Sequence, residues 1–149
     1  MVQLELIDIA HKSYLDVYNL RNNVLRFPLK MDLKDEDLND EKNQFIFIAL
    51  EDAQLVACLL LKKINPSILK LRQMAVLPEK QKKGLGSALV NFAEDWARQN
   101  NYQKIELHAR NHALGFYAKL GYSKCDGEFL EVGIPHFKMI KFIQEDQTV

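Results

Sequence analysis

Met74-Ala75-Val76-Leu77-Pro78-Glu79-Lys80-Gln81-Lys82-Lys83-Gly84-Leu85-Gly86-Ser87 is the stretch of sequence that decides the fold. The apolar run 68–76 predicts a strand that ends before Pro78, because proline cannot donate to a strand ladder. Apolar residues at helical spacing continue from Leu85 to Trp96 and predict a helix. A strand thus leads through a glycine-containing loop into a helix, whose free backbone N–H groups and dipole favour a phosphate.

Several other interpretations of this loop compete with phosphate binding. Two glycines before a helix can form a simple turn, and the lysines at 80, 82 and 83 can be solvated surface residues. A dinucleotide-binding Rossmann loop is excluded, because Gly84-Leu85-Gly86 lacks the third glycine and follows the fourth predicted strand. A Walker A loop is excluded, because no Gly-Lys-Ser/Thr follows four variable residues. A simple turn and a phosphate-binding loop both stay open.

Strands and helices are predicted on both sides of this stretch. Helices are expected from Ser13 to before Pro28, from Leu85 and from Ala113, and residues 28–43 are expected to form a loop or a short helix. Strands are expected at 2–9, 45–50, 55–61, 68–76, 104–109, 128–132 and 137–143. This order predicts an α/β fold with a central mixed, mostly antiparallel sheet of six or seven strands and helices on both faces. The length of 149 residues predicts one domain, 1–149.

Composition excludes several functional classes. Lys and Arg number 20 and Asp and Glu 20, and this balance argues against binding to nucleic acid or to a membrane surface. No apolar run reaches the roughly 18 residues of a membrane span, and the first residues do not resemble a secretion signal, so we expect a cytoplasmic protein. Cys58 and Cys125 are too few for a disulfide framework and lack metal-ligand spacing, so no metal is expected.

Two motifs resemble those of a known family. Gln81-Lys82-Lys83-Gly84-Leu85-Gly86 resembles the Q/R-x-x-G-x-G/A signature of the GCN5-related N-acetyltransferase (GNAT) superfamily, five residues after a strand that ends at Val76. Asn111, followed by Phe116-Tyr117-Ala118-Lys119-Leu120-Gly121-Tyr122, resembles the family's F-Y-x-x-x-G-F/Y segment. Strand order and length agree as well, so the resemblance covers essentially the whole chain. It implies a GNAT-like acyl-CoA N-acyltransferase fold.

The resemblance also implies a site for acetyl-CoA. The backbone of Met74, Ala75 and Val76 would bind the pantetheine arm like an added strand, at a bulge. The pyrophosphate would be held by main-chain N–H groups of Gln81, Lys82, Lys83, Gly84, Leu85, Gly86 and Ser87. Asn111 would lie near the pantetheine, and the hydroxyl of Tyr117 would point at the CoA sulfur. Asn111 can instead be a plain helix N-cap, and Tyr117 can instead pack on an apolar helix stripe.

The expected reaction needs an acid and a base. Tyr117 suits the acid, because a phenol can protonate a leaving thiolate. Relatives place a glutamate on the strand before the glycine loop, but residues 68–76 contain none. The segment 129–136, Phe-Leu-Glu-Val-Gly-Ile-Pro-His, is similar to an F-x-E-x-G-I-P-H ending in one branch of the superfamily. It suggests His136 as the base, with Glu131 orienting or replacing it.

Two alternatives to this base stay open. One is a plain hairpin in which Glu131 is solvated and His136 is satisfied by backbone, and the other is a water relay without a dedicated base. His108 and His112 rank behind His136 as candidates.

The function expected from these motifs is an acetyl-CoA-dependent N-acetyltransferase. It would acetylate a primary amine of a small molecule or peptide by direct attack in a ternary complex, as a monomer or a homodimer. A route through a covalent cysteine intermediate is disfavoured, because neither cysteine has a catalytic setting. The rival function is a non-catalytic sensor or interaction module that binds acetyl-CoA or CoA on the same fold.

Charge and one helix bear on the acceptor. Residues 62–83 hold seven basic residues against one acidic residue, and residues 30–52 hold eight acidic against three basic. The basic segment leads into the loop expected to bind a polyanionic cofactor, and the acidic segment suggests a cationic amine acceptor. Arg21 and Arg26, on the first predicted helix, either clamp an acceptor carboxylate or are ordinary exposed helix residues.

Overall fold

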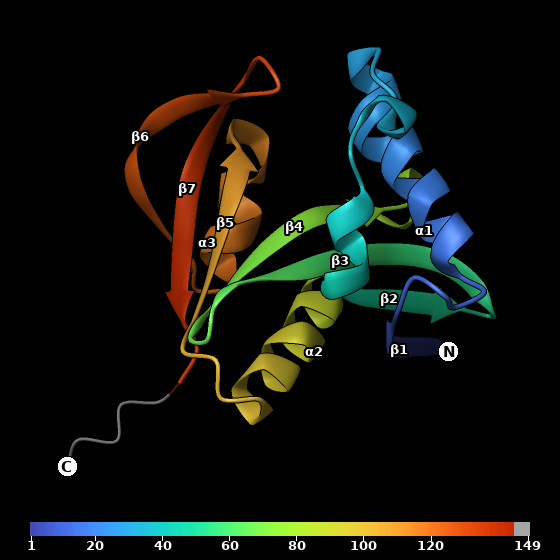
Figure 1. Ribbon diagram of the computed structural model, residues 1–149, viewed down its shortest axis with the longest axis horizontal. Coiled ribbons are helices and arrows are strands. Elements are labelled where there is room, and N and C mark those ends of the chain that lie inside the picture. The colour runs from blue at the N-terminus through green and yellow to red at the C-terminus, as the bar shows by residue number, and fades with distance from the viewer. Residues whose placement is uncertain (145–149) are drawn as a thin grey trace. The chain divides into compact units, whose positions relative to one another are not determined.

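The computed structural model describes residues 1–144 of the chain (Figure 1). Seven strands form a sheet in the order β1-β2-β3-β4-β5-β7-β6. The chain folds as two compact units, one made of Met1–Lys62 and Gln73–Ala93, the other of Lys63–Arg72 and the chain from Glu94 on. A single domain over 1–149 stays a prediction, and its residues 145–149 lie outside the described part.

The first unit contains an antiparallel ladder. β1 (Val2–Ile7) pairs antiparallel with β2 (Phe45–Glu51), and β2 pairs antiparallel with β3 (Gln54–Asn65). Residues 55–61 of β3 are buried throughout. An unbroken apolar run of this kind is typical of a strand that is covered on both faces.

Helices cover both faces of this ladder. α1 (Tyr14–Arg21) packs Val17 and Leu20 into a core cluster with Ile46 and Ile48 of β2. Phe47 points to the other face, where its ring meets Phe92 of α2 (Leu85–Gln99) at 5.9 Å between centroids. Because successive side chains of a strand point to opposite faces, β2 packs against α1 on one face and against α2 on the other.

The second unit contains a parallel pair of strands. β4 (Ile68–Val76) pairs parallel with β5 (Lys104–Arg110) from Ile68 to Leu71. β5 pairs antiparallel with β7 (Ile134–Phe142), and β7 with β6 (Ser123–Glu131). The β6–β7 hairpin turns through Val132 and Gly133, both at positive φ (Figure 1). α3 (Leu114–Lys119) ends before Gly121, which has a φ of +96°.

A buried carboxylate anchors this second unit. Glu94, on α2, is 1% exposed and accepts hydrogen bonds from the Tyr122 hydroxyl at 2.9 Å and from Lys141 Nζ at 2.8 Å. Arg98 lies 3.6 Å from the same carboxylate. A buried charge is tolerated when it is paired and hydrogen-bonded in this way.

The elements differ from the sequence-based expectation at several boundaries. β3 continues to Asn65 rather than ending at residue 61, and β7 begins at Ile134 rather than at residue 137. The first helix changes at Asn22 into a π-helical turn, Asn22–Arg26, and Ser13 makes no side-chain cap. Residues 27–43 form three short 3-10 turns, Phe27–Leu29, Leu33–Asp35 and Asn39–Asn43. β6 begins at Ser123 rather than near residue 128, because a register shift between Cys125 and Phe129 lets the strand continue through an irregular stretch.

Candidate functional site

The glycine loop presents backbone donors at the start of α2. After β4, a 3-10 turn at Pro78–Lys80 leads into residues 81–84, and α2 begins at Leu85. The first helical hydrogen bond runs from the Ala88 amide to the Gly84 carbonyl at 3.0 Å. The amides of Leu85, Gly86 and Ser87 therefore precede the first helical bond, where an anion is favoured.

Backbone conformation explains one of the two glycines. Gly84 has a φ of +82°, and a Cβ added there would meet nothing within 4 Å. The left-handed backbone, rather than lack of space, thus selects glycine. Lys82 also has a positive φ, +63°, although it is not glycine. Alternating left-handed residues of this kind turn successive amides toward the same side of a loop.

The positive charges near this loop are not equivalent. Lys80 Nζ lies 2.6 Å from Glu51 Oε1, and this hydrogen bond, followed by the charge of Glu51, raises the pKa of Lys80. Gln81 donates from Nε2 to the Val76 carbonyl at 3.1 Å, which ties the loop to the end of β4. Lys82 and Lys83 are exposed and, within residues 1–144, have no acidic partner. They are the cations available to an anionic ligand.

The charged segments partly neutralise each other. Lys80 pairs with Glu51, and Lys62 pairs with Asp40 at 3.7 Å, so each pair joins the basic segment to the acidic one. The acidic segment therefore serves in part as a partner for the chain's own lysines. This weakens the expectation, drawn from charge alone, that it selects a cationic acceptor.

β4 contains one residue in a left-handed conformation. Gln73 has a φ of +56°, which breaks the extended conformation just before Met74, Ala75 and Val76. The parallel ladder with β5 covers only Ile68–Leu71. Gln73 was not among the residues singled out from sequence, because a left-handed glutamine has no sequence signal.

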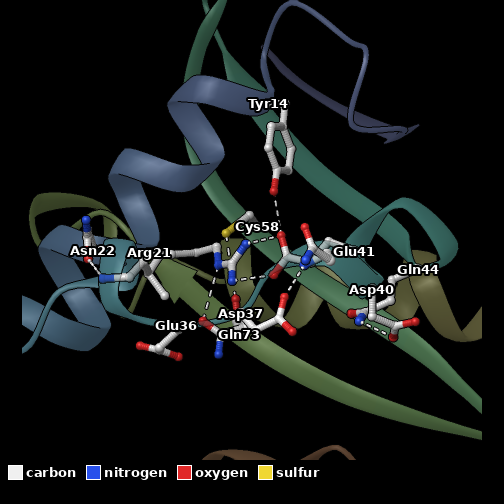
Figure 2. A network of polar contacts seen from close by, with 12 residues as sticks. Tyr14, Arg21, Asn22, Glu36, Asp37, Asp40, Glu41, Gln44, Cys58 and Gln73 are labelled. Atoms are coloured by element: carbon white, nitrogen blue, oxygen red, sulfur yellow. Dashed lines mark hydrogen bonds and ion pairs between the residues drawn. The ribbon is translucent and has the colours of Figure 1, made fainter.

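A buried network of polar side chains holds Gln73 (Figure 2). Arg21 is fully buried and donates from Nη1 and Nη2 to the two carboxylate oxygens of Glu41 at 2.8 and 2.7 Å. The Tyr14 hydroxyl donates to Glu41 Oε1 at 2.6 Å, and Arg21 Nε donates to Gln73 Oε1 at 3.2 Å. Burial, with the hydrogen bond to Glu41, raises the pKa of Tyr14 to about 12, so this phenol stays protonated.

Neither arginine of the first helix is available to clamp an acceptor. Arg21 is committed to Glu41, and Arg26 donates from Nε to Glu36 at 2.6 Å. The alternative expectation, that both are exposed helix residues, is wrong as well, because Arg21 and Arg26 are 0% and 7% exposed. Sequence alone could not reveal this, since the partner carboxylates lie 20 and 10 residues further along the chain.

Tyr117 is buried on α3, and its hydroxyl makes no hydrogen bond to any described residue. Its ring contacts those of Phe116 and Tyr122 edge-on, at centroid distances of 5.0 and 5.8 Å. Burial raises the pKa of Tyr117, so the phenol keeps its proton at neutral pH. The ring thus takes part in packing, while the hydroxyl forms no hydrogen bond that would stabilise the fold among residues 1–144.

Asn111 does not cap α3. It begins a 3-10 turn, Asn111–Ala113, it is exposed, and the residue at the N-cap of α3 is Ala113. The N-cap interpretation of Asn111 is therefore wrong for this helix. A role near a bound ligand stays a prediction.

Glu131 lies between two histidines on neighbouring strands. Its Oε1 is 3.0 Å from Nδ1 of His108 on β5, and its Oε2 is 3.6 Å from Nε2 of His136 on β7. His136 is 5% exposed, and its Nδ1 lies 2.8 Å from the Ile134 carbonyl oxygen. The ring of Phe129 packs edge-on against His108 at 4.8 Å. His108, ranked behind His136 from sequence, is thus the closer partner of Glu131. No sequence spacing could indicate this contact between a side chain of β5 and a side chain of β6.

A cysteine nucleophile and a metal ion would be alternatives to an acid and a base. Cys58 is fully buried, and burial raises the pKa of its thiol to about 12, so it is not a thiolate nucleophile. Within residues 1–144, no group of three or more His, Cys, Asp or Glu side chains is arranged to hold a metal ion. Among the same residues, no helix combines the length and the apolar character that a membrane crossing requires.

The fold is similar to those of acyl-CoA-dependent N-acetyltransferases. An aminoglycoside 6′-N-acetyltransferase complexed with coenzyme A has a TM-score of 0.80 and 18% identity, over 98% of this chain and 99% of that one. The ribosomal-protein-S18-alanine N-acetyltransferase from Escherichia coli has a TM-score of 0.77 and 18% identity, over 100% and 99%. At these identities the likeness concerns the fold, and it confirms the α/β N-acyltransferase architecture predicted from sequence.

The chain belongs to the Acetyltransferase (GNAT) family, whose family model matches residues 11–122. YyaT, an uncharacterized protein of Bacillus subtilis, is 38% identical over 79 residues, which are 53% of this chain and 53% of that protein. The match thus spans about half the length of this curated relative. Family membership confirms the resemblance drawn from the glycine loop and the segment around Tyr117.

Proposed function

We propose that the protein is an acetyl-CoA-dependent N-acetyltransferase that acetylates a primary amine of a small molecule or peptide by direct attack. The observation that carries the proposal is the loop before α2, where Leu85, Gly86 and Ser87 offer amides ahead of the first helical hydrogen bond. Lys82 and Lys83 add exposed positive charge beside them. A diphosphate is the kind of anion that such donors favour.

The loop and the end of β4 would bind different parts of acetyl-CoA. The backbone N–H groups from Gln81 to Ser87 would hold the pyrophosphate, while Met74, Ala75 and Val76 would hydrogen-bond the pantetheine arm as an added strand. The left-handed Gln73 supports this second role, because it interrupts the extended conformation of β4 directly before the residues that would meet a ligand. Asn111 would approach the same arm with its exposed side-chain amide.

Tyr117 would act as the acid. Bound acetyl-CoA supplies a thioester that accepts an amine at its acyl carbon and releases a thiolate. Tyr117 keeps its proton at neutral pH because burial raises its pKa, and its hydroxyl has no partner among residues 1–144. It is therefore suited to donate that proton to the thiolate as the C–S bond breaks.

The first test is binding of CoA or acetyl-CoA, followed by thermal unfolding. At about 100 times Kd, binding adds roughly 2.7 kcal/mol of stability, which raises Tm by about 5–10 °C in a chain of this size. The variant Gly86→Glu should lose this shift, because it places a carboxylate among the amides that meet the pyrophosphate. Gly127→Glu is the matched control: it adds the same charge at an exposed glycine where a Cβ meets nothing within 4 Å.

The second test is turnover, measured as release of free thiol from acetyl-CoA with a broad panel of amines. Thiol release that depends on both acetyl-CoA and one class of amine supports the enzyme. A CoA-dependent rise in Tm, with no thiol release in the presence of any amine, would favour the rival function, a non-catalytic CoA-binding module. The lack of a glutamate in residues 68–76 is the sequence feature that supports this rival. No Tm shift at millimolar acetyl-CoA would contradict both functions.

A further inference from the structure

Three side chains from three neighbouring strands of the second unit form one polar cluster. His108 comes from β5, Glu131 from β6 and His136 from β7, and the carboxylate of Glu131 touches both imidazoles with different oxygens. In the ladder His136 stands opposite Phe129 and Arg110. The two histidines look alike in sequence, but their ring nitrogens are placed differently.

His108 has the proton arrangement of a base. A carboxylate only accepts hydrogen bonds, so the contact of 3.0 Å between Nδ1 and Glu131 Oε1 places the hydrogen of a neutral His108 on Nδ1. Its Nε2 then carries a lone pair, and within residues 1–144 that nitrogen has no partner. The side chain is 23% exposed. An incoming uncharged amine can therefore reach this lone pair.

His136 has the opposite arrangement. Its Nδ1 donates to the Ile134 carbonyl oxygen at 2.8 Å, so its lone pair is on Nε2. That nitrogen faces Glu131 Oε2 at 3.6 Å, and the side chain is only 6% exposed. Its basic nitrogen is thus enclosed beside a carboxylate within its own hairpin. A lone pair cannot donate to a carboxylate, so Nε2 holds Glu131 only when both ring nitrogens of His136 carry hydrogen. The enclosed position suits a residue that positions Glu131 better than one that takes a proton from a substrate.

The strand pairing also distinguishes His108. The parallel ladder between β4 and β5 ends at the pair Leu71–Leu107, so His108 is the first residue of β5 beyond it. β5 continues to Arg110, and the turn Asn111–Ala113 and the helix of Tyr117 follow directly. His108 therefore lies on the same short stretch of chain as two residues already given roles in acetyl transfer.

The charges around the cluster keep Glu131 ionised. Burial raises the pKa of Glu131, but the hydrogen bond from His108 and the charges of His108, Lys70 and His136 outweigh it, so the pKa lies below its ordinary value. Lys138 stands opposite His108 in the ladder, but its Nζ is directed to Glu106 Oε2 at 3.6 Å. An ionised Glu131 stabilises the imidazolium that forms when His108 takes a proton.

We propose that His108 is the general base of the acetyl transfer, and that Glu131 and His136 are positioning residues that hold it in the reactive tautomer. The inference rests on the proposed function and replaces His136 as the candidate base. As the amine nitrogen bonds to the acyl carbon, its proton passes to His108 Nε2. The C–S bond breaks with its electron pair on sulfur, and the thiolate receives the phenolic proton of Tyr117.

The test compares single variants in kcat, in KM for acetyl-CoA and in the pH–rate profile. We expect His108→Gln to lower kcat by about 10²–10⁴-fold without changing the Tm shift caused by acetyl-CoA. Imidazoles change charge between about pH 5 and 8, so the wild-type rate should rise with pH there, and His108→Gln should remove this rise. Glu131→Gln should lower kcat by about 10-fold and shift the pH range in which the rate rises. Glu131→Asp should restore part of the lost kcat.

His112→Gln is the matched control, because His112 is an exposed histidine on the turn directly after β5 and takes no part in the cluster. It should leave kcat and the pH profile unchanged. Loss of the pH-dependent rise in His136→Gln, with the rise retained in His108→Gln, would overturn the proposal in favour of His136. A pH profile that persists in both variants would overturn it in favour of a water relay.

A measurement without turnover keeps this inference separate from the proposed function. Nitrogen-15 NMR of the histidine side chains reports which ring nitrogen carries the hydrogen. Neutral His108 is expected as the Nδ1–H tautomer in the wild type, with part of the population shifting to Nε2–H in Glu131→Gln. A wild-type Nε2–H tautomer of His108 would overturn the proposal even where acetyl-CoA binding and thiol release are normal.

Discussion

At the scale of single residues, burial decides which polar groups can do chemistry. Arg21 and Glu41 satisfy each other, and Cys58 stays protonated. The Tyr117 hydroxyl and His108 Nε2, by contrast, have no partner within residues 1–144. No buried side-chain nitrogen or oxygen among the described residues lacks a hydrogen-bond partner, so these two atoms are accessible from outside and are the ones to test for function.

Tyr117→Phe tests one of these groups. Because the hydroxyl has no hydrogen bond to a described residue, its removal should leave Tm nearly unchanged. We expect kcat to fall by about 10–100-fold while the Kd for acetyl-CoA stays within about twofold, since the phenol would act on the leaving thiolate. Steady-state kinetics and calorimetric titration measure the two quantities. An unchanged kcat would leave Tyr117 with a packing role alone.

At the scale of elements, the hairpin between β6 and β7 positions the cluster of His108, Glu131 and His136. Its turn residues, Val132 and Gly133, have φ values of +49° and +74°. A two-residue turn with both residues left-handed has the twist that suits a hairpin and strongly favours Asn-Gly. Valine is branched at Cβ and is poorly suited to that conformation.

Val132→Asn should therefore stabilise the protein by about 1 kcal/mol, because asparagine adopts a positive φ with less strain. Urea unfolding monitored by circular dichroism measures the change. Val2→Asn is a suitable comparison, since Val2 is also an exposed valine but lies in β1 without a positive φ, and it should give no gain. Equal effects of the two substitutions would show that the turn holds no strain.

At the scale of the whole molecule, two kinds of ion pair contribute very differently to stability. Arg21 and Glu41 are 0% and 2% exposed, whereas the side chains of Lys80 and Glu51 are 26% and 28% exposed. Removing one member of a buried pair leaves the other charge unpaired in a medium of low polarity, which costs about 3–5 kcal/mol. A more exposed pair contributes about 0–1 kcal/mol.

Glu41→Gln should therefore lower the free energy of unfolding by about 3–5 kcal/mol, while the matched variant Glu51→Gln should lower it by no more than about 1 kcal/mol. Urea unfolding of both variants at neutral pH makes the comparison. Glu41 also holds the network that supports Gln73 ahead of Met74, so the folded fraction of Glu41→Gln should bind acetyl-CoA more weakly. Equal losses of stability in the two variants would contradict the importance of burial.

Much of the molecule could be predicted from local pattern. Residues 45–50 and 55–61 show the alternation or the unbroken apolar runs of strands, and the helix from Leu85 has a clear apolar face. The glycine at position 84 is a local requirement of backbone conformation, so the loop motif that carries the family assignment is visible in the sequence. Segments with weak periodicity, such as residues 27–43, were placed least well.

The sequence by itself determined the order of the elements, the family and the position of the glycine loop, because these depend on neighbours a few residues apart. Only the tertiary structure decided the partners of charged groups. It paired Arg21 with Glu41 rather than with an acceptor, and Lys80 with Glu51 rather than with a phosphate. It also joined His108 to Glu131, 23 residues apart, because β5 and β6 both flank β7. Hydrogen bonds and burial act through space, so the arrangement of the strands sets the different surroundings of His108 and His136.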